Sequence, residues 1–557
     1  MDKLLVSCVE TENEIQNTIE DQSSKFHSVL LLNQKKKNDS TIIQGNIPSW
    51  ISVRMIRLGP AKWDLDDFVL NHWLDGCAML CKFIIRNGTI KYSSKFLDSD
   101  AYRKMNKVNR PVYTEFGTRA FPDPCKNVFS RIFSQIVPSD LTDNGLLNVF
   151  KLADEYYAAS ETCNIWKFCP KSLDVTRKIN LDKINGVNLA CSHTQFMENE
   201  DYAYNMSSSF LTGMKYHLIK IPLFQYEETR NKSFLERSSI LTTISSNWTT
   251  CIAYYHSFGI TKNYIIFIEL PLLVNGFKLA TCTPKGRPLK DCFEWHPNEK
   301  SKFYVICKFT GKIVQKYYSA AFFYFHIINC YEEDNHIIVD LMAYENADIL
   351  EKWDLNLMRQ NIYYEDNQSV PKRFILPLSI KNSSIGENLV TLKNQKSRAI
   401  LSEKNIITLT GEELGRPGFE LPTINRNYNG KKYKYCYGSG VFEKGNFANS
   451  ILKLNVDDQS VLVWKDSDEH FPGECLFVAR PGSIEEDDGV ILNVVLSSNE
   501  SKPHYVLILD SKTFTEIGRA YLGSGTGIIP PTIHGVFEYI NDEDENDKND
   551  DEKNVDY

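Results

Sequence analysis

From Trp50 onward, the sequence consists mainly of short apolar runs separated by turn residues, and this pattern restricts the fold more than any other feature. The segment "KFIIRNGTIKYSSKFL" (82–97) predicts a β-hairpin, because two strand-like runs flank an Asn-Gly turn. Further strand-like runs lie at 335–344, 460–465, 489–498 and 504–522. Many short strands over roughly 490 residues, with no obvious linker, favour a closed radial all-β architecture. A propeller fits this pattern better than a string of β-sandwiches.

Helical periodicity is sparse and local. Only "DYAYNMSSSF" (201–210) and "ADILEKWDLNLMRQNI" (347–362) stand out as helix candidates. The helices are therefore expected to be minor additions to a β structure.

The two ends of the chain differ in composition from the rest. Residues 1–45 are rich in Asn, Lys and Gln and predict a flexible polar segment. The last 17 residues, 541–557, hold nine acids and two lysines and predict a disordered acidic tail, with a tail that contacts a partner as the alternative. Residues 46–540 between these ends are expected to form the propeller domain.

Charge and composition exclude several classes of function. Without the tail, the chain has 61 basic and 62 acidic residues and no basic stripe with interleaved aromatics, which argues against a nucleic-acid partner. No apolar run reaches the ~18 residues of a membrane span, and the chain start lacks the apolar core of a signal peptide. Fourteen cysteines without Cys-x-x-Cys pairs argue against a zinc ribbon or a disulfide scaffold. A cytoplasmic protein with reduced thiols is expected.

Four of the eleven histidines have a spacing that suits a radial fold. They lie near the edges of apolar strands at His193, His256, His326 and His534. The intervals are 63, 70 and 208 residues, and four-stranded blades of roughly 70 residues would bring all four to equivalent strand ends around one axis. A single histidine beside a strand, however, is more often a hydrogen-bonded structural residue.

Ordered motifs along most of the chain resemble those of the carotenoid cleavage oxygenase family, particularly the animal β-carotene oxygenases and the retinoid isomerohydrolase. The matching segments are "NHWLDGCAML" (71–80), "FGTRAFPDPCKNVFSRIFS" (116–134), "YYAASET" (156–162), "YYHSFGITKNYIIFIELPL" (254–272), "FHIINCYEEDNHIIVDL" (325–341), "KRFILPL" (372–378), "EEDDGVILNVVLSS" (485–498) and "IHGVFEY" (533–539). The resemblance implies a seven-bladed β-propeller with a helical or loop dome over a metal site on its axis.

The resemblance also implies the composition of that site. It assigns an Fe²⁺ ion to four ligands, His193, His256, His326 and His534. Four neutral imidazoles suit a ferrous ion and leave coordination positions open for O₂. Three glutamates match carboxylates that orient the imidazoles and offset the metal charge, namely Glu161, Glu420 and Glu474. Each of these glutamates, taken alone, would more often be a surface acid.

Three further residues match family positions, each with a simpler alternative. Thr162 matches a threonine that crowds the open metal position, and the alternative is an ordinary strand threonine. Asp75 matches a carboxylate important to the fold or the site, or it is a tight-turn aspartate. Cys125 matches a cysteine that is acylated in some relatives, although a buried structural cysteine is the preferred interpretation.

The chain also departs from the family pattern near its ligands. Gln195 replaces a second histidine after His193, and Ile327 follows His326 in place of His or Gln. "GEC" and "PTIHG" also differ from the usual family segments. None of these changes removes a predicted ligand or glutamate, but they leave the identity of the substrate open.

The resemblance implies an iron dioxygenase that cleaves a conjugated double bond of a carotenoid or apocarotenoid, centrally or eccentrically, to carbonyl products. One alternative is an isomerohydrolase acting on retinyl esters, and another is a carotenoid-binding propeller that has lost catalysis. Because carotenoids partition into bilayers, a peripheral contact with a membrane surface is expected, with residues 131–138 as a candidate segment.

Overall fold

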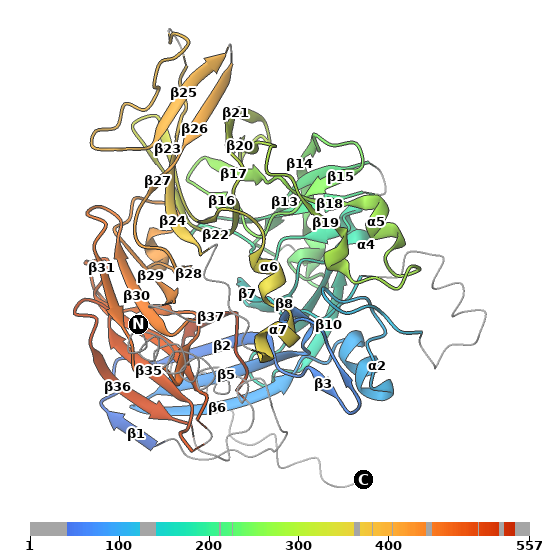
Figure 1. The fold of residues 1–557 in the computed structure, drawn as a ribbon. Coiled ribbons are helices and arrows are strands. Elements are labelled where there is room, and N and C mark those ends of the chain that lie inside the picture. Colours follow the sequence, from blue (N-terminus) through green and yellow to red (C-terminus); the bar gives the residue numbers. More distant parts are fainter. Residues whose placement is uncertain are drawn as a thin grey trace, which may run out of the picture.

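The computed structural model describes residues 42–122, 141–210, 213–225, 227–360, 368–380, 383–403, 405–441, 448–499, 501–522 and 529–540. These residues form a mostly-β fold with a few short helices, as the strand pattern predicts. In Figure 1 the strands surround the middle of the molecule, and helices α6 and α7 lie in front of it. Cys125, residues 131–138 and the acidic tail lie outside the described residues.

The described strands include seven sheets of four or six strands. The first contains β37 (His534–Tyr539), β2 (Val53–Pro60), β5 (Ala78–Arg86) and β6 (Thr89–Phe96). The second contains β7 (Asn148–Leu152), β8 (Glu155–Ala159), β9 (Asn164–Phe168) and β10 (Val175–Asn180). The third contains β11 (Leu189–Ala190), β12 (Tyr202–Ser209), β13 (Lys215–Pro222) and β14 (Ser239–Ser245).

The remaining large sheets follow in chain order. The fourth contains β16 (Gly259–Ile260), β17 (Tyr264–Glu269), β20 (Ser301–Cys307), β21 (Ile313–Ser319), β26 (Ile406–Thr410) and β25 (Arg398–Glu403). The fifth contains β22 (Phe323–Glu333), β23 (His336–Tyr344), β24 (Val370–Pro377) and β27 (Glu412–Glu413). The sixth contains β28 (Phe419–Thr423), β29 (Tyr435–Gly440), β30 (Ser450–Asn455) and β31 (Val461–Trp464). The seventh contains β32 (His470–Pro472), β33 (Leu476–Ala479), β34 (Gly489–Ser497), β35 (Tyr505–Asp510), β36 (Glu516–Tyr521) and β1 (Ile42–Gly45).

Small sheets and short helices complete the described structure. The small sheets contain β15 (Cys251–Ala253), β18 (Leu272–Asn275) and β19 (Phe293–Trp295), and β3 (Asp64–Leu65) with β4 (Phe68–Val69). The α-helices are α2 (Asp100–Val108), α4 (Leu181–Asn185), α5 (Gly276–Thr281), α6 (Ile349–Lys352) and α7 (Leu355–Arg359). The 3₁₀-helices are η1 (Trp73–Asp75), η2 (Glu227–Thr229), η3 (Leu235–Arg237), η4 (Leu289–Cys292) and η5 (Arg426–Tyr428). Within the described ranges, none of these helices has the length and apolar character needed to cross a bilayer.

The structure agrees with the predicted hairpin and with one of the two predicted helical segments. Strands β5 and β6 form the predicted hairpin, and Asn87 and Gly88 in its turn have φ angles of 49° and 70°. Both central residues of a type I′ turn need positive φ, so the Asn-Gly pair is suited to it. The helix candidate at 201–210 is wrong, because this segment is strand β12, paired with β13 over eight residues. Residues 347–362 do contain the two short helices α6 and α7.

The two ends of the described chain both join sheets. Strand β37 pairs antiparallel with β2, with Leu58 opposite His534, so a C-terminal strand completes the first sheet. Strand β1 pairs with β36 at the edge of the seventh sheet. The described β structure therefore begins inside the range that the sequence assigns to the polar N-terminal segment.

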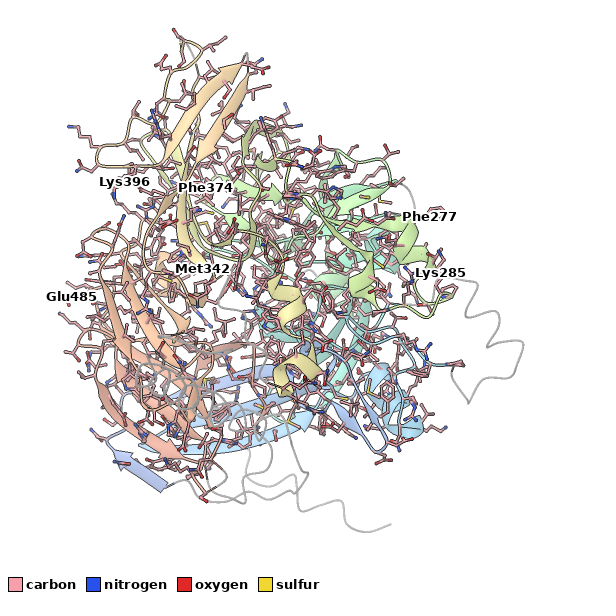
Figure 2. All side chains as sticks on the ribbon, in the orientation of Figure 1. Phe277, Lys285, Met342, Phe374, Lys396 and Glu485 are labelled. Carbon is pink, nitrogen blue, oxygen red and sulfur yellow. The ribbon has the colours of Figure 1, made fainter. Side chains whose placement is uncertain are left out.

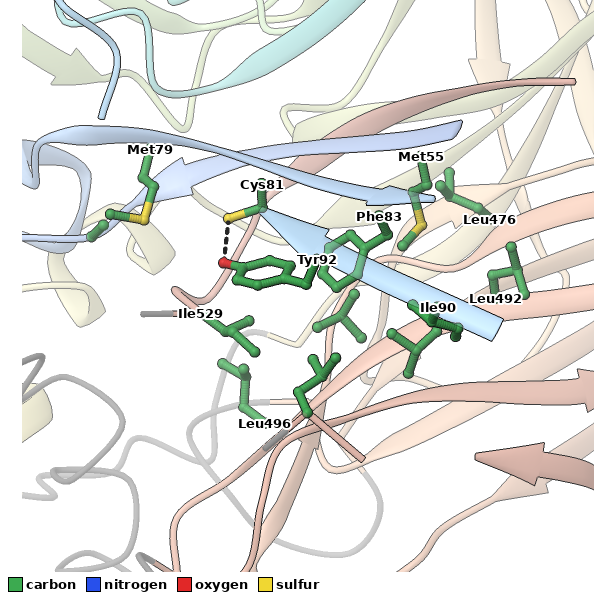
Figure 3. Close-up of a cluster of buried hydrophobic side chains, with 14 of the residues drawn as sticks. Met55, Met79, Cys81, Phe83, Ile90, Tyr92, Leu476, Leu492, Leu496 and Ile529 are labelled. Atoms are coloured by element: carbon green, nitrogen blue, oxygen red, sulfur yellow. Dashed lines mark hydrogen bonds between the residues drawn. The ribbon is translucent and has the colours of Figure 1, made fainter. Parts of the chain in front are cut away.

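The apolar core lies between neighbouring sheets, and β34 shows how. All nine residues of this strand are buried, and its apolar side chains alternate between two hydrophobic clusters, one on each face of the sheet. Leu492 and Leu496 pack with Met55 and Phe83 of the first sheet, as Figure 3 shows for several of these residues. Neighbouring positions such as Ile491 pack on the other face, in a cluster that includes Tyr437 of the sixth sheet. The seventh sheet is therefore covered on both faces, which explains its continuous apolar sequence.

Candidate metal centre

The four predicted histidines come from four different sheets, and their rings meet. His193 follows β11, His256 precedes β16, His326 lies within β22, and His534 begins β37. The Nε2 atoms of His193 and His256 are 3.0 Å apart, and those of His256 and His326 are 3.2 Å apart. The corresponding distance from His326 to His534 is 3.1 Å. One nitrogen from each of the four rings lies within 4.8 Å of the others, so the cluster has the size of a single-ion site.

A carboxylate lies behind three of the four imidazoles. The pairs are His256 Nδ1 with Glu161 Oε1 at 2.5 Å, His326 Nδ1 with Glu420 Oε2 at 2.7 Å, and His534 Nδ1 with Glu474 Oε1 at 2.7 Å. An ionised carboxylate only accepts hydrogen bonds, so Nδ1 is the protonated nitrogen of each ring and Nε2 presents a lone pair. Among the described residues, the ring of His193 has no such carboxylate.

This arrangement of nitrogens fits a metal cation. The lone pairs on Nε2 of His256, His326 and His534 face one another, and lone pairs at these distances repel unless a cation lies between them. Burial lowers the pKa of His193 well below its usual value, and the neighbouring imidazoles lower it further. This favours the neutral ring, which can offer a nitrogen lone pair to a metal ion. Imidazole nitrogens bind zinc, copper, iron and nickel ions. The structure thus brings the four histidines together, while their role as ligands stays a prediction.

Glu420 is directed toward His326 by an unusual backbone conformation. The next residue, Leu421, has a φ of 50°, and its N–H donates to Glu420 Oε2 at 2.7 Å. The pairing of β28 with β29 shifts register between Glu420 and Thr423. A positive φ is strained for leucine, so the surrounding sheet holds the backbone in place here. On the opposite strand, a Cβ at Gly438 would lie 2.6 Å from the Glu420 carbonyl oxygen, which explains the glycine.

Replacing Glu420 by Gln is expected to lower metal affinity by roughly 10- to 100-fold, because the neutral amide holds the His326 ring less firmly. Metal content after dialysis against a graded chelator series measures this. Glu413→Gln, at an exposed position on β27, is the matched control and should retain the wild-type affinity. Equal metal retention by Glu420→Gln and wild type would contradict an orienting role for Glu420.

Glu474 joins the cluster to a buried arginine that the sequence analysis did not identify. Arg57 Nη1 donates to Glu474 Oε2 at 2.5 Å, and the arginine is only 1% exposed. Its remaining nitrogens donate to Thr532 Oγ1 at 3.2 Å and to the Ile533 carbonyl at 3.3 Å. Burial raises the pKa of Glu474, and the Arg57 charge acts in the opposite direction. Arginine within the otherwise apolar run "VRMIRLGP" was the signal in the sequence.

Glu161 has a second partner, which the sequence analysis also missed. The hydroxyl of Tyr254 donates to Glu161 Oε1 at 3.0 Å, the same oxygen that lies beside His256. Thr162, the next residue, is buried, and its hydroxyl donates to the Thr142 carbonyl at 3.1 Å. That hydroxyl is therefore engaged within the protein.

Asp75 acts in a loop rather than beside the histidines. It is fully buried and accepts from the Gly117 N–H at 2.8 Å, the Thr118 hydroxyl at 2.5 Å and the His72 N–H at 3.1 Å. Burial raises its pKa to about 6. The structure therefore places it at the end of η1, where its carboxyl group ties this turn to the loop at Gly117 and Thr118.

A cavity of about 400 Å³ opens onto the histidine cluster. His256, His326 and His534 line it, together with Glu161, Thr162 and Glu420. The rest of its wall is mainly apolar and includes Leu74, Phe116, Leu146, Leu147, Leu279, Leu289, Phe293, Phe325, Ile349, Leu350, Trp353 and Met358. Helices α6 and α7 thus supply part of the wall. A mainly apolar cavity beside a set of nitrogen donors suits a long hydrophobic ligand.

Together, the mostly-β fold and the four-histidine cluster have the features of a metalloprotein with a single-ion, non-haem site. The family model described as Retinal pigment epithelial membrane protein matches residues 32–538. The chain belongs to this family, which is the carotenoid cleavage oxygenase family that the motifs resemble.

Curated relatives match almost the whole chain. The chain is 38% identical to the β,β-carotene 15,15'-dioxygenase of Gallus gallus over 90% of this chain and 95% of the relative. It is 37% identical to the Homo sapiens protein of the same name, over 89% of this chain and 91% of the relative. It is 35% identical to the mitochondrial carotenoid-cleaving dioxygenase of Mustela putorius furo, over 89% of this chain and 93% of the relative.

Solved structures share the fold at lower identity. Cobalt-substituted apocarotenoid oxygenase of Synechocystis has a TM-score of 0.73 and 19% identity, and the match covers 93% of this chain and 99% of that chain. A chimera of apocarotenoid oxygenase and RPE65 matches with the same TM-score, identity and coverage. The first of these neighbouring proteins thus contains a metal ion, in this case cobalt.

Proposed function

We propose that this protein is a carotenoid cleavage dioxygenase, which uses O₂ to cleave a conjugated double bond of a carotenoid or apocarotenoid into carbonyl products. Relatives at 35–38% identity over about nine tenths of the chain are named as such dioxygenases. The observation that carries the proposal is the convergence of four histidines from distant parts of the chain, three of which line an apolar cavity.

Fe²⁺ is the proposed metal. Held by the four imidazoles, it would supply the redox chemistry needed for O₂ to react with a double bond. The residues of the chain do the rest. Glu161, Glu420 and Glu474 hold the rings and offset the metal charge. The apolar wall holds the polyene and excludes water, and Thr162 narrows the cavity beside the rings.

The seven large sheets are proposed to be the blades of a propeller whose axis passes through the cluster. The innermost strands support this, because β16 lies against β22, β22 against β28, and β37 against β7. The pairing of β37 with β2 also suits a closed ring, since it joins the last part of the chain to the first. Helices α6 and α7 and the loop around η1 would form the dome. The boundaries at 46 and 540 stay predictions.

Peripheral contact with a membrane surface would give an apolar substrate a route into the cavity. Phe277 on α5 is 76% exposed, and Leu279 on the same helix lines the cavity. Figure 2 shows Phe277 and Lys285 at the same outer edge of the molecule. An exposed aromatic side chain with a basic one at the same edge of the molecule suits an interfacial contact. We place the contact surface here, whereas the sequence candidate at 131–138 lies outside the described residues. A cytoplasmic location stays a prediction.

The need for O₂ separates this proposal from an isomerohydrolase that works without it. The iron-loaded protein is expected to convert β-carotene to aldehydes in air, and strict anoxia should lower the rate by at least about a hundredfold, since O₂ is a substrate. Chromatography of the products measures this, and readmitted air should restore the rate. Retinyl ester turnover under anoxia would overturn the dioxygenase proposal. Polyene binding without aldehyde in air would instead favour a carotenoid-binding protein that has lost catalysis.

A further inference from the structure

The apolar cavity contains a buried acid that the proposed reaction does not use. Glu115 lines the cavity beside Phe116 and is only 2% exposed. Its backbone is fixed, since the N–H donates to the Thr118 carbonyl at 2.9 Å and the carbonyl accepts from the Leu289 N–H at 3.1 Å. A carboxyl group in an apolar wall is costly unless it has partners, so its contacts indicate its role.

One oxygen of Glu115 has a partner within the protein. The Thr142 hydroxyl donates to Oε1 at 2.7 Å. No other side-chain hydrogen bond and no ion pair to Glu115 occurs within the described ranges. Burial raises the pKa of Glu115 well above its usual range, and the charges of Asp75 and Asp143 raise it further. Burial in an apolar wall with one hydroxyl as its partner thus favours the protonated form of this carboxyl group. Because Oε1 accepts from Thr142, the proton belongs on Oε2.

Glu115 is also connected to the wall that carries the histidine cluster. The Thr142 carbonyl accepts from the Thr162 hydroxyl at 3.1 Å, while the Thr142 side chain donates to Glu115. Both threonines line the same cavity as His256. A ligand in this cavity would therefore face a wall that contains both the histidine cluster and the Glu115 carboxyl group.

We propose that Glu115 is a specificity residue that donates a hydrogen bond from Oε2 to an oxygen atom of an oxygenated polyene. The oxygen is a hydroxyl or carbonyl group on the part of the polyene that lies away from the cleaved bond. A pure hydrocarbon cannot accept this bond and would leave a buried donor without a partner, which disfavours it. This inference rests on the proposed function, because it assumes that the cavity holds a polyene.

The test compares two polyenes that differ only in oxygen, β-carotene and its dihydroxylated counterpart. Binding to the iron-loaded protein is followed by quenching of tryptophan fluorescence, since Trp73 and Trp353 line the cavity. Wild type is expected to bind the hydroxylated polyene at least about tenfold more tightly, as one well-placed hydrogen bond allows. In Glu115→Met, which removes the donor, the ratio of the two dissociation constants should approach one, because the hydroxylated polyene loses its hydrogen bond and β-carotene no longer leaves a buried donor without a partner.

Three further variants separate recognition from a structural role. Glu115→Gln retains a hydrogen-bond donor of similar shape and should keep most of the preference. Glu115→Ala removes the donor without adding bulk, and it serves if the Met variant does not fold. Thr142→Val removes the bond to Oε1, together with the bond that the Thr142 hydroxyl accepts from the Asn144 N–H at 3.2 Å, and is the control for loss of these internal contacts. A merely structural Glu115 would change both dissociation constants by the same factor.

The outcomes also distinguish this inference from the proposed function. Aldehyde formation from both polyenes, with a wild-type preference that Glu115→Met and Glu115→Ala leave intact, would overturn the role of Glu115 and leave the dioxygenase standing. A preference lost in both truncations, but without aldehyde in air, would support Glu115 as a recognition residue and overturn the dioxygenase. A wild type that binds both polyenes equally would overturn the inference.

Discussion

Replacing His256 by Ala is expected to reduce bound iron to below about one tenth of the wild-type content and to lower turnover by at least about a hundredfold. This histidine lies within the cluster, because its Nε2 is 3.0 Å from that of His193 and 3.2 Å from that of His326. Its removal deletes a donor and also leaves Glu161 without its imidazole partner. Loss of a carboxylate behind a ligand costs about 10- to 100-fold in affinity, and loss of the ligand itself should cost more.

Elemental analysis and product quantification on the purified variant measure both effects. His217→Ala is the matched control, since His217 is a buried histidine on β13 that bonds Ser209 Oγ at 2.8 Å and Thr243 Oγ1 at 2.9 Å, outside the cluster. This control should retain iron even if it loses some stability. Full iron content and full turnover in His256→Ala would show that the four histidines are not the metal site.

The strand pattern predicted a mostly-β fold because apolar periodicity and turn residues can be recognised in short stretches of sequence. Alternating or continuous apolar runs and the Asn-Gly turn at 87–88 determine which segments become strands. The error at 201–210 has a physical reason. This segment is strand β12 because it pairs with β13 and is buried on both sides, which depends on neighbours distant in sequence and overrides weak local propensity.

The site depends still more on contacts between distant residues. His256 and Glu161 are 95 positions apart, and His326 and Glu420 are 94 apart, so spacing alone could not pair them. Family resemblance was needed to choose these glutamates among the many acids of the chain. Arg57 shows the limit of that approach, because its partner Glu474 lies 417 positions away and no motif drew attention to it. The position of Arg57 within a largely apolar strand sequence was the only local signal in the sequence.

The positive and negative charges around the cluster would balance once Arg57 and the proposed ferrous ion are included. Three carboxylates, Glu161, Glu420 and Glu474, face the imidazoles. Their negative charges would balance the two positive charges of the proposed ferrous ion together with the single charge of Arg57. Without Arg57 the buried group would carry an excess negative charge, and buried unpaired charges are costly. The arginine is therefore expected to matter more for the stability of the protein than for contacts with substrate.

Replacing Arg57 by Met should accordingly lower the free energy of unfolding by about 3–5 kcal/mol, the usual cost of removing one partner of a buried ion pair. The expected loss is large because Arg57 and Glu474 have side-chain exposures of only 1% and 11%. Urea unfolding followed by circular dichroism measures it. Arg480→Met removes an exposed pair with Asp488, whose side chains are 47% and 34% exposed, and should cost less than about 1 kcal/mol.

The double variant Arg57→Met with Glu474→Gln tests the cause of that loss. If the destabilisation comes from a Glu474 charge left without its partner, the neutral amide removes the problem, and the double variant should be less destabilised than the sum of the two single variants. Additive losses would indicate instead that Arg57 acts mainly through its bonds to Thr532 and Ile533. Wild-type stability in Arg57→Met would contradict the charge balance itself. His256→Ala should lose iron while largely keeping the fold, so the two sets of variants separate metal binding from the stability of the protein around it.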